Sequence, residues 1–145
     1  MVKKQIIELL NLLGFRQDGN VYTKKYDTAL HPLQVDVEKE RIYYENSGIT
    51  VNRSTTSNFS EDENLVVLEC VDRLLSKGYH ANHIELEPHW KLGHGTKGGY
   101  ADIWVRTYTD NAFDGNDDDK NSLLIIECKT SGAKFKEAWN DTLDD

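Results

Sequence analysis

Two short stretches of sequence decide the expected fold: residues 99–105, GYADIWV, and residues 123–129, LLIIECK. The first predicts a strand over residues 100–107, because apolar and β-branched side chains dominate it. The second predicts a buried central strand that is apolar on both faces as far as Glu127. The acidic segment 110–121 predicts a hairpin loop that joins the two strands.

The ionisable residues of these strands point to metal chemistry. Residues two apart share a face of a strand, so Glu127 and Lys129 point the same way while the side chain of Cys128 points away. Buried charges are costly unless they bind something, and Asp102 with Glu127 offers the oxygen ligands that Mg²⁺ prefers. Bound Mg²⁺ would polarise a phosphodiester and lower the pKa of a water. Lys129 would orient that water or offset charge on the phosphate.

The expected metal site comprises Asp102, Glu127 and Cys128, with Mn²⁺ as a substitute for Mg²⁺. A plainer alternative is a simple surface pair between Glu127 and Lys129, because Glu-x-Lys alone is a weak motif. The position of the pair at the end of four consecutive apolar residues favours the metal site, since charged residues in such a place are rarely idle.

A helix and a short strand are expected before these two strands. The helix covers residues 60–77, where Ser60 and Glu63 match a capping box, and it ends at Gly78. Alternating apolar residues predict the strand over 84–86, which a proline ends.

The remaining elements complete an α/β architecture. Apolar residues at helical spacing predict a helix over residues 2–13, and a β-meander is expected over residues 15–44. A last helix, with an apolar stripe over residues 135–143, follows the second strand. The order implies an α/β domain around a mixed central sheet flanked by helices. We expect residues 1–57 to form an N-terminal subdomain and residues 58–145 the main core.

The helix over residues 60–77 offers a third carboxylate. At about 100° per residue, Glu63 borders the apolar stripe, whereas Glu69 shares a polar face with Asp72 and is expected to be solvated. Glu63 is therefore a candidate catalytic residue, although the capping box explains it equally well. Glu87 is a further candidate support, for which an exposed strand residue is the favoured alternative.

The order and spacing of these residues resemble the PD-(D/E)xK nuclease superfamily. The longer pattern resembles the N-terminal nuclease domain of Type I restriction subunits and of fused restriction-methylation enzymes. The resemblance covers about residues 58–140 and rests on Glu63, on residues 99–103 and on residues 127–130. Ala101 stands where the family often has proline.

The resemblance implies a restriction-endonuclease-like fold and a Mg²⁺-dependent endonuclease that hydrolyses DNA within a restriction-modification enzyme. Asp102, Glu127 and Lys129 carry over as catalytic residues. DNA and further domains of the same polypeptide, or restriction-modification subunits, are the implied partners. A Gln-x-x-x-Tyr element follows the second strand in the family, but no Gln occurs here after Gln34. We therefore expect a core truncated at its C-terminus that cleaves poorly alone.

The net charge of −8 limits the function classes that fit. Binding to phosphates needs clustered Lys and Arg, so avid DNA binding by this chain alone is not expected. The charge also argues against a repair or junction nuclease, because such enzymes are usually small basic dimers. A degenerate nuclease fold that serves as a docking or regulatory module is a second alternative, against which the intact Asp-Glu-Lys set argues. No apolar run suits a membrane span, and a cytoplasmic location is expected.

Three other signals carry no function. Residues 93–98, GHGTKG, match the spacing of a dinucleotide-binding loop, but a strand rather than a helix follows them. The histidines between residues 80 and 94 fit no zinc-binding spacing. Cys70 and Cys128 lack a nearby Cys or His partner in sequence, so two reduced, buried thiols are expected.

Overall fold

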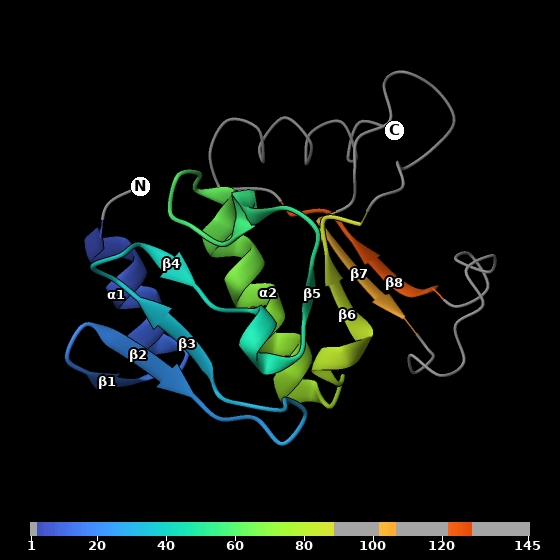
Figure 1. The fold of residues 1–145 in the computed structure, drawn as a ribbon, viewed down its shortest axis with the longest axis horizontal. Helices are drawn as coiled ribbons and strands as arrows, with labels where there is room; N and C mark the ends of the chain where they lie inside the picture. The colour runs from blue at the N-terminus through green and yellow to red at the C-terminus, as the bar shows by residue number, and fades with distance from the viewer. Residues whose placement is uncertain (1–2, 89–101, 107–121, 129–145) are drawn as a thin grey trace, which may run out of the picture.

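The computed structural model describes residues 3–88, 102–106 and 122–128. In these ranges the chain is mixed α/β, with two α-helices and two four-stranded sheets (Figure 1). The expected α/β class, the mixed sheet and the N-terminal helix with its meander are confirmed. The predicted last helix, the glycine-rich loop, the acidic loop and Lys129 lie outside the described residues.

The first part of the chain is a helix and an antiparallel meander. Helix α1 buries Ile6 and Leu10, two residues one turn apart, and Gly14 follows it with φ +88°. A Cβ in that left-handed region would strain the backbone, which explains the glycine. The helix and the four strands of the meander are α1 (Lys3–Leu12), β1 (Arg16–Asp18), β2 (Val21–Lys24), β3 (Leu33–Asp36) and β4 (Arg41–Ile42).

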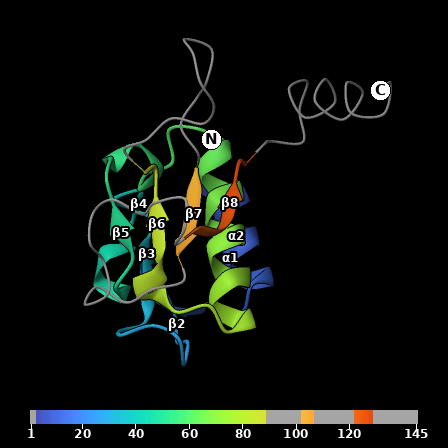
Figure 2. The ribbon, with the colours of Figure 1, turned by 90° about the vertical axis from the view of Figure 1, so that its right-hand side faces the viewer.

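The second sheet holds the strands predicted to carry chemistry. Its strand order is β5-β6-β7-β8, with β5 parallel to β6 and the other neighbours antiparallel. Figure 2 looks toward this sheet, with α2 beside it. Its strands are β5 (Thr50–Val51), β6 (Ile84–Leu86), β7 (Ile103–Arg106) and β8 (Ser122–Ile126). Three short 3₁₀ turns connect the elements: Glu45–Ser47, Ser54–Thr56 and Ala81–His83.

Helix α2 (Glu63–Lys77) crosses the middle of the molecule, with the meander on one side and the second sheet on the other (Figure 1). Its buried face includes Val67, Leu68 and Val71. Fully burying one such side chain contributes about 1.5–3 kcal/mol. The helix ends at Gly78 as predicted, because a left-handed residue there lets its N–H reach the carbonyls of the last turn.

The predicted capping box at the start of α2 is wrong. The N-cap residue is Asp62, which has a helical backbone and makes no side-chain capping bond. Ser60 is instead bound to Asn58, whose Oδ1 accepts hydrogen bonds from both the backbone N–H and the hydroxyl of Ser60. The Ser60 hydroxyl, which would have capped the helix, is thus engaged in a local hydrogen bond to Asn58.

The expectation that β8 is a central strand is also wrong for the described part of the chain. There β8 is the last strand in the sheet order, and Leu124 and Ile125 are 37% and 46% exposed. An apolar run predicts a strand, but its place in the sheet depends on which strands pair, and that is set by the whole chain.

One hydrophobic cluster joins both parts of the chain. It contains Ile6, Leu10 and Leu33 from the first part together with Val71 and Val105 from the second. Strand β5, which precedes residue 57, pairs with β6 of the second sheet. The boundary at residue 57 stays a prediction. Neither α-helix of the described ranges is long and apolar enough to cross a membrane.

Candidate functional site

Asp102 and Glu127 lie at the same end of the second sheet. Asp102 immediately precedes β7, Glu127 immediately follows β8, and the two strands are antiparallel neighbours. The backbone N–H of Asp102 donates to the carbonyl of Ile126 at 3.1 Å, and the N–H of Cys128 donates to Oδ2 of Asp102 at 2.6 Å. The Asp102 carboxylate is therefore fixed against the main chain next to Glu127. The two residues lie near the ends of adjacent strands, as the sequence predicted.

Glu87 brings a third carboxylate to this end of the sheet. It follows β6, and its N–H donates to the carbonyl of Asp102 at 2.9 Å. The hydroxyl of Thr55 lies 3.0 and 2.9 Å from the two carboxylate oxygens, which it can serve as donor. Glu87 is half-buried and has φ +48°, so the favoured expectation of an ordinary exposed strand residue is wrong.

Thr55 was not found by sequence reasoning. It lies in a run of polar residues, which indicates only a break between regular elements. Its role depends on Glu87, 32 residues later in the chain. The positive φ of Glu87 likewise has no local signal, since glycine and asparagine are the residues that usually mark a left-handed backbone. A proline at position 88 predicts the end of β6 but not the direction of the Glu87 side chain.

Glu63 contributes from α2 and is half-buried at the first residue of the helix. Burial raises the pKa of Asp102, the hydrogen bond from the Cys128 N–H opposes that shift, and the negative charges of Glu63, Glu127 and Glu87 reinforce it. Asp102 thus lies in the electrostatic reach of three other carboxylates that come from three different elements. The helix N-terminus beside Glu63 adds a partial positive charge.

The donor set fits a hard divalent cation, but it is not gathered around one point. Within residues 3–88, 102–106 and 122–128, no three His, Cys, Asp or Glu side chains are arranged as a metal-binding group. Glu127 is exposed, whereas Asp102, Glu63 and Glu87 are half-buried. Carboxylate oxygens are the ligands that Mg²⁺ and Mn²⁺ take. The site therefore offers ligand atoms of the right type for these cations, but the ligands do not surround a single point.

Cys128 meets this site through its main chain, while its thiol faces the core. It is 3% exposed, and its Sγ donates a weak hydrogen bond to Sγ of Cys70 on α2 at 3.9 Å. This hydrogen bond lowers the pKa of Cys70 to about 7 and raises that of Cys128, which burial raises further. The opposite exposures of Glu127 and Cys128 agree with the alternation predicted for a strand.

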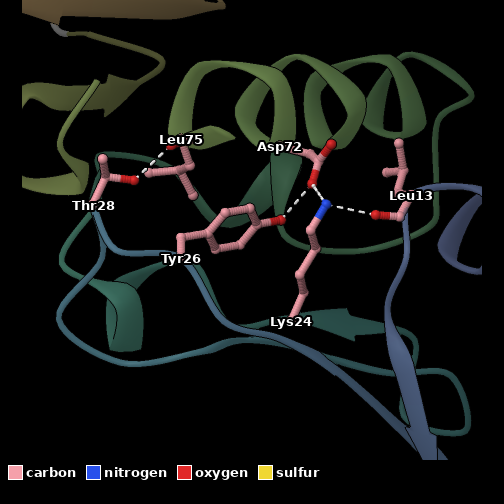
Figure 3. Close-up of polar contacts among 6 residues, drawn as sticks. All are labelled: Leu13, Lys24, Tyr26, Thr28, Asp72 and Leu75. Atoms are coloured by element: carbon pink, nitrogen blue, oxygen red, sulfur yellow. Dashed lines mark hydrogen bonds and ion pairs between the residues drawn. The ribbon is translucent and has the colours of Figure 1, made fainter. Parts of the chain in front are cut away.

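A second polar cluster holds α2 against the meander (Figure 3). Asp72 accepts hydrogen bonds from Lys24 Nζ at 2.7 Å and from the Tyr26 hydroxyl at 2.6 Å, and the hydroxyl of Thr28 donates to the carbonyl of Leu75. Burial and the bond to Asp72 raise the pKa of Tyr26. The polar face predicted for α2 is correct for Glu69, which pairs with Arg73 at the surface, and wrong for Asp72, which is 6% exposed.

No protein-family model matches this chain, no protein of curated function matches its sequence, and no solved structure matches its fold.

Proposed function

We propose that this chain is a metal-dependent nuclease domain that hydrolyses phosphodiester bonds of DNA. One observation carries the proposal: Asp102 and Glu127 lie at the same end of two paired strands, where the Cys128 N–H holds the Asp102 carboxylate in place. Carboxylate oxygens at such a position are the ligands that Mg²⁺ and Mn²⁺ take. The succession of α2, β6, β7 and β8 is compatible with the restriction-endonuclease-like fold that the sequence motifs suggest.

Asp102 and Glu127 would hold the cation. The Cys128 N–H donates to Oδ2 of Asp102 and so orients the carboxylate. This leaves Oδ1 for a ligand. Bound Mg²⁺ or Mn²⁺ would polarise the phosphodiester and lower the pKa of a water. Glu63 would support the site from α2, and Lys129 would orient the attacking water or neutralise charge on the phosphate.

The net charge of −8 makes the wider context part of the proposal. An acidic chain gains little from phosphate contacts, so recognition of DNA would depend on further domains or on restriction-modification subunits. The main alternative from another class is a docking or regulatory module on a degenerate nuclease fold. That alternative requires no metal, so metal binding separates the two.

The test is calorimetric titration with Mn²⁺ of the wild-type chain, Asp102→Ala and Asp27→Ala. Asp27 is an exposed aspartate beside the C-terminal end of α2, so its variant matches the charge change away from the site. We expect one Mn²⁺ site in the wild type and in Asp27→Ala and none in Asp102→Ala. Equal Mn²⁺ affinity in all three, or no binding to any, would reject the metal site.

Cleavage is tested on plasmid DNA with the same proteins and with Lys129→Ala, supplied with the partner domains or subunits where these are known. Lys129→Ala should keep its Mn²⁺ affinity and lose cleavage, because its role is in the reaction and not in holding the metal. Near-normal nicking by this variant would remove Lys129 from the mechanism.

A further inference from the structure

The two cysteines of the chain lie side by side although 58 residues separate them. Cys70 lies on α2 and is half-buried, whereas Cys128 follows β8 and is buried. Both are free thiols, and their Sγ atoms are 3.9 Å apart. A disulfide bond needs about 2.05 Å between the sulfurs, so they must approach by about 1.9 Å (3.9 minus about 2.05). A side-chain rotation with a small shift of the backbone at Cys128 covers such a distance.

We propose that Cys70 and Cys128 form a reversible disulfide that switches the neighbouring carboxylate site off. Cys70 is the less buried of the two residues, so an oxidant of the peroxide class reaches its sulfur first. Its sulfur attacks one peroxide oxygen, the O–O bond breaks, and Cys70 becomes a sulfenic acid while hydroxide leaves. The sulfur of Cys128 then attacks Cys70 Sγ, the S–O bond breaks, and water leaves. In sum, two thiols lose two electrons and two protons, and one peroxide becomes two waters.

The link to the site is the main chain of Cys128. Its N–H donates to Oδ2 of Asp102 at 2.6 Å, and the residue before it is Glu127. Movement of Cys128 toward α2 lengthens that hydrogen bond and shifts the two proposed metal ligands relative to each other. This part of the inference rests on the proposed function. Loss of an outer hydrogen bond to a ligand typically weakens metal binding by about 10- to 100-fold.

Thiol chemistry tests the disulfide without reference to metal or DNA. The reduced chain is treated with hydrogen peroxide and then analysed by thiol titration, intact mass and a non-reducing gel. We expect the monomer to lose both titratable thiols and two hydrogens in mass, with recovery on adding dithiothreitol. Cys70→Ser and Cys128→Ser should not give this product. Two titratable thiols in the treated wild type, or disulfide-linked dimers alone, would overturn the proposal.

Mn²⁺ titration tests the coupling on the same samples. The oxidised wild type should bind Mn²⁺ at least about 10-fold more weakly than the reduced wild type, and dithiothreitol should restore the affinity. Cys70→Ser, treated identically, should show no change. An intramolecular disulfide that leaves Mn²⁺ affinity unaltered would overturn the switch. Absence of Mn²⁺ binding in the reduced wild type would overturn the proposed function and the coupling together, while the thiol and mass results would still decide whether the disulfide forms.

Discussion

At the scale of the residue, Asp102 is subject to opposing effects on its pKa. Burial and three neighbouring carboxylates raise its pKa, while a hydrogen bond from the Cys128 N–H favours the charged form. A carboxyl group whose folded pKa is raised binds more protons in the folded state than in the unfolded state. Its contribution to stability is therefore fully present below the unfolded pKa of about 3.8 and is lost as pH rises through the folded pKa.

Asp102→Asn should accordingly be more stable than the wild type at pH 8 but not at pH 4. Asn keeps an oxygen for the Cys128 N–H and removes the charge. Because Asp102 is only half-buried, water screens the effect to less than about 1 kcal/mol, which corresponds to about 2–4 °C in melting temperature. Thermal melts of both proteins in a chelator, at the two pH values, measure it. A variant that melts lower than the wild type at pH 8 would contradict the assigned environment.

At the scale of the element, α2 makes three different kinds of interaction along its length. The charge of Glu63, its first residue, helps to raise the pKa of Asp102, while Cys70 contacts Cys128 and Asp72 binds Lys24 and Tyr26. The last contact fixes the helix against a segment 46 to 48 residues earlier in the chain. The position of Glu63 relative to the sheet thus depends on contacts that are made nine residues further along the helix.

Glu63→Gln should weaken Mn²⁺ binding without lowering the melting temperature. The structure has no Ser60 capping box, so no capping bond is lost. The change removes a favourable interaction with the helix N-terminus of roughly 0.3–1 kcal/mol. It also relieves repulsion with Asp102, which offsets that loss. Glu61→Gln is the matched control, because it removes the same charge from an exposed residue just before α2. If both variants weaken Mn²⁺ binding equally, Glu63 has no specific part in the site.

At the scale of the whole molecule, one hydrophobic cluster of the described residues spans the expected boundary at residue 57. Sequence patterns could predict the elements whose signal is local: the helix that buries Ile6 and Leu10, and the end of α2 at Gly78. They also placed Asp102 and Glu127 at the ends of neighbouring strands, since strands that follow one another in sequence pair in most cases.

Apart from the Ser60 cap, which is lost to a local bond with Asn58, the features that sequence reasoning missed depend on partners far along the chain. The burial of Asp72 needs Lys24 and Tyr26, the position of Glu87 needs Thr55, and the cysteine contact spans 58 residues. The edge position of β8 is likewise a property of the sheet order and not of its apolar sequence. No periodicity or spacing rule encodes such pairings, because they form only when the two segments pack.

The single cluster predicts one cooperative unfolding transition rather than two. Calorimetry should give equal calorimetric and van 't Hoff enthalpies. Leu10→Ala in α1 and Leu68→Ala in α2 both remove a fully buried side chain, and each should destabilise that one transition by about 2–5 kcal/mol. Two transitions, with each variant shifting a different one, would support independent units on either side of residue 57.

The backbone of Glu87 has a consequence for which substitutions evolution would tolerate at this position. Two non-glycine residues, Glu40 and Glu87, have left-handed backbones in the described part of the chain. Such a conformation costs an ordinary residue about 1–2 kcal/mol, and glycine would avoid the cost. Glu40 lies in an exposed turn where glycine would serve as well, but at position 87 glycine would give up the carboxylate held by Thr55. Drift to glycine at position 40 would therefore be neutral, whereas drift to glycine at position 87 would mark a lineage in which the carboxylate site is no longer maintained.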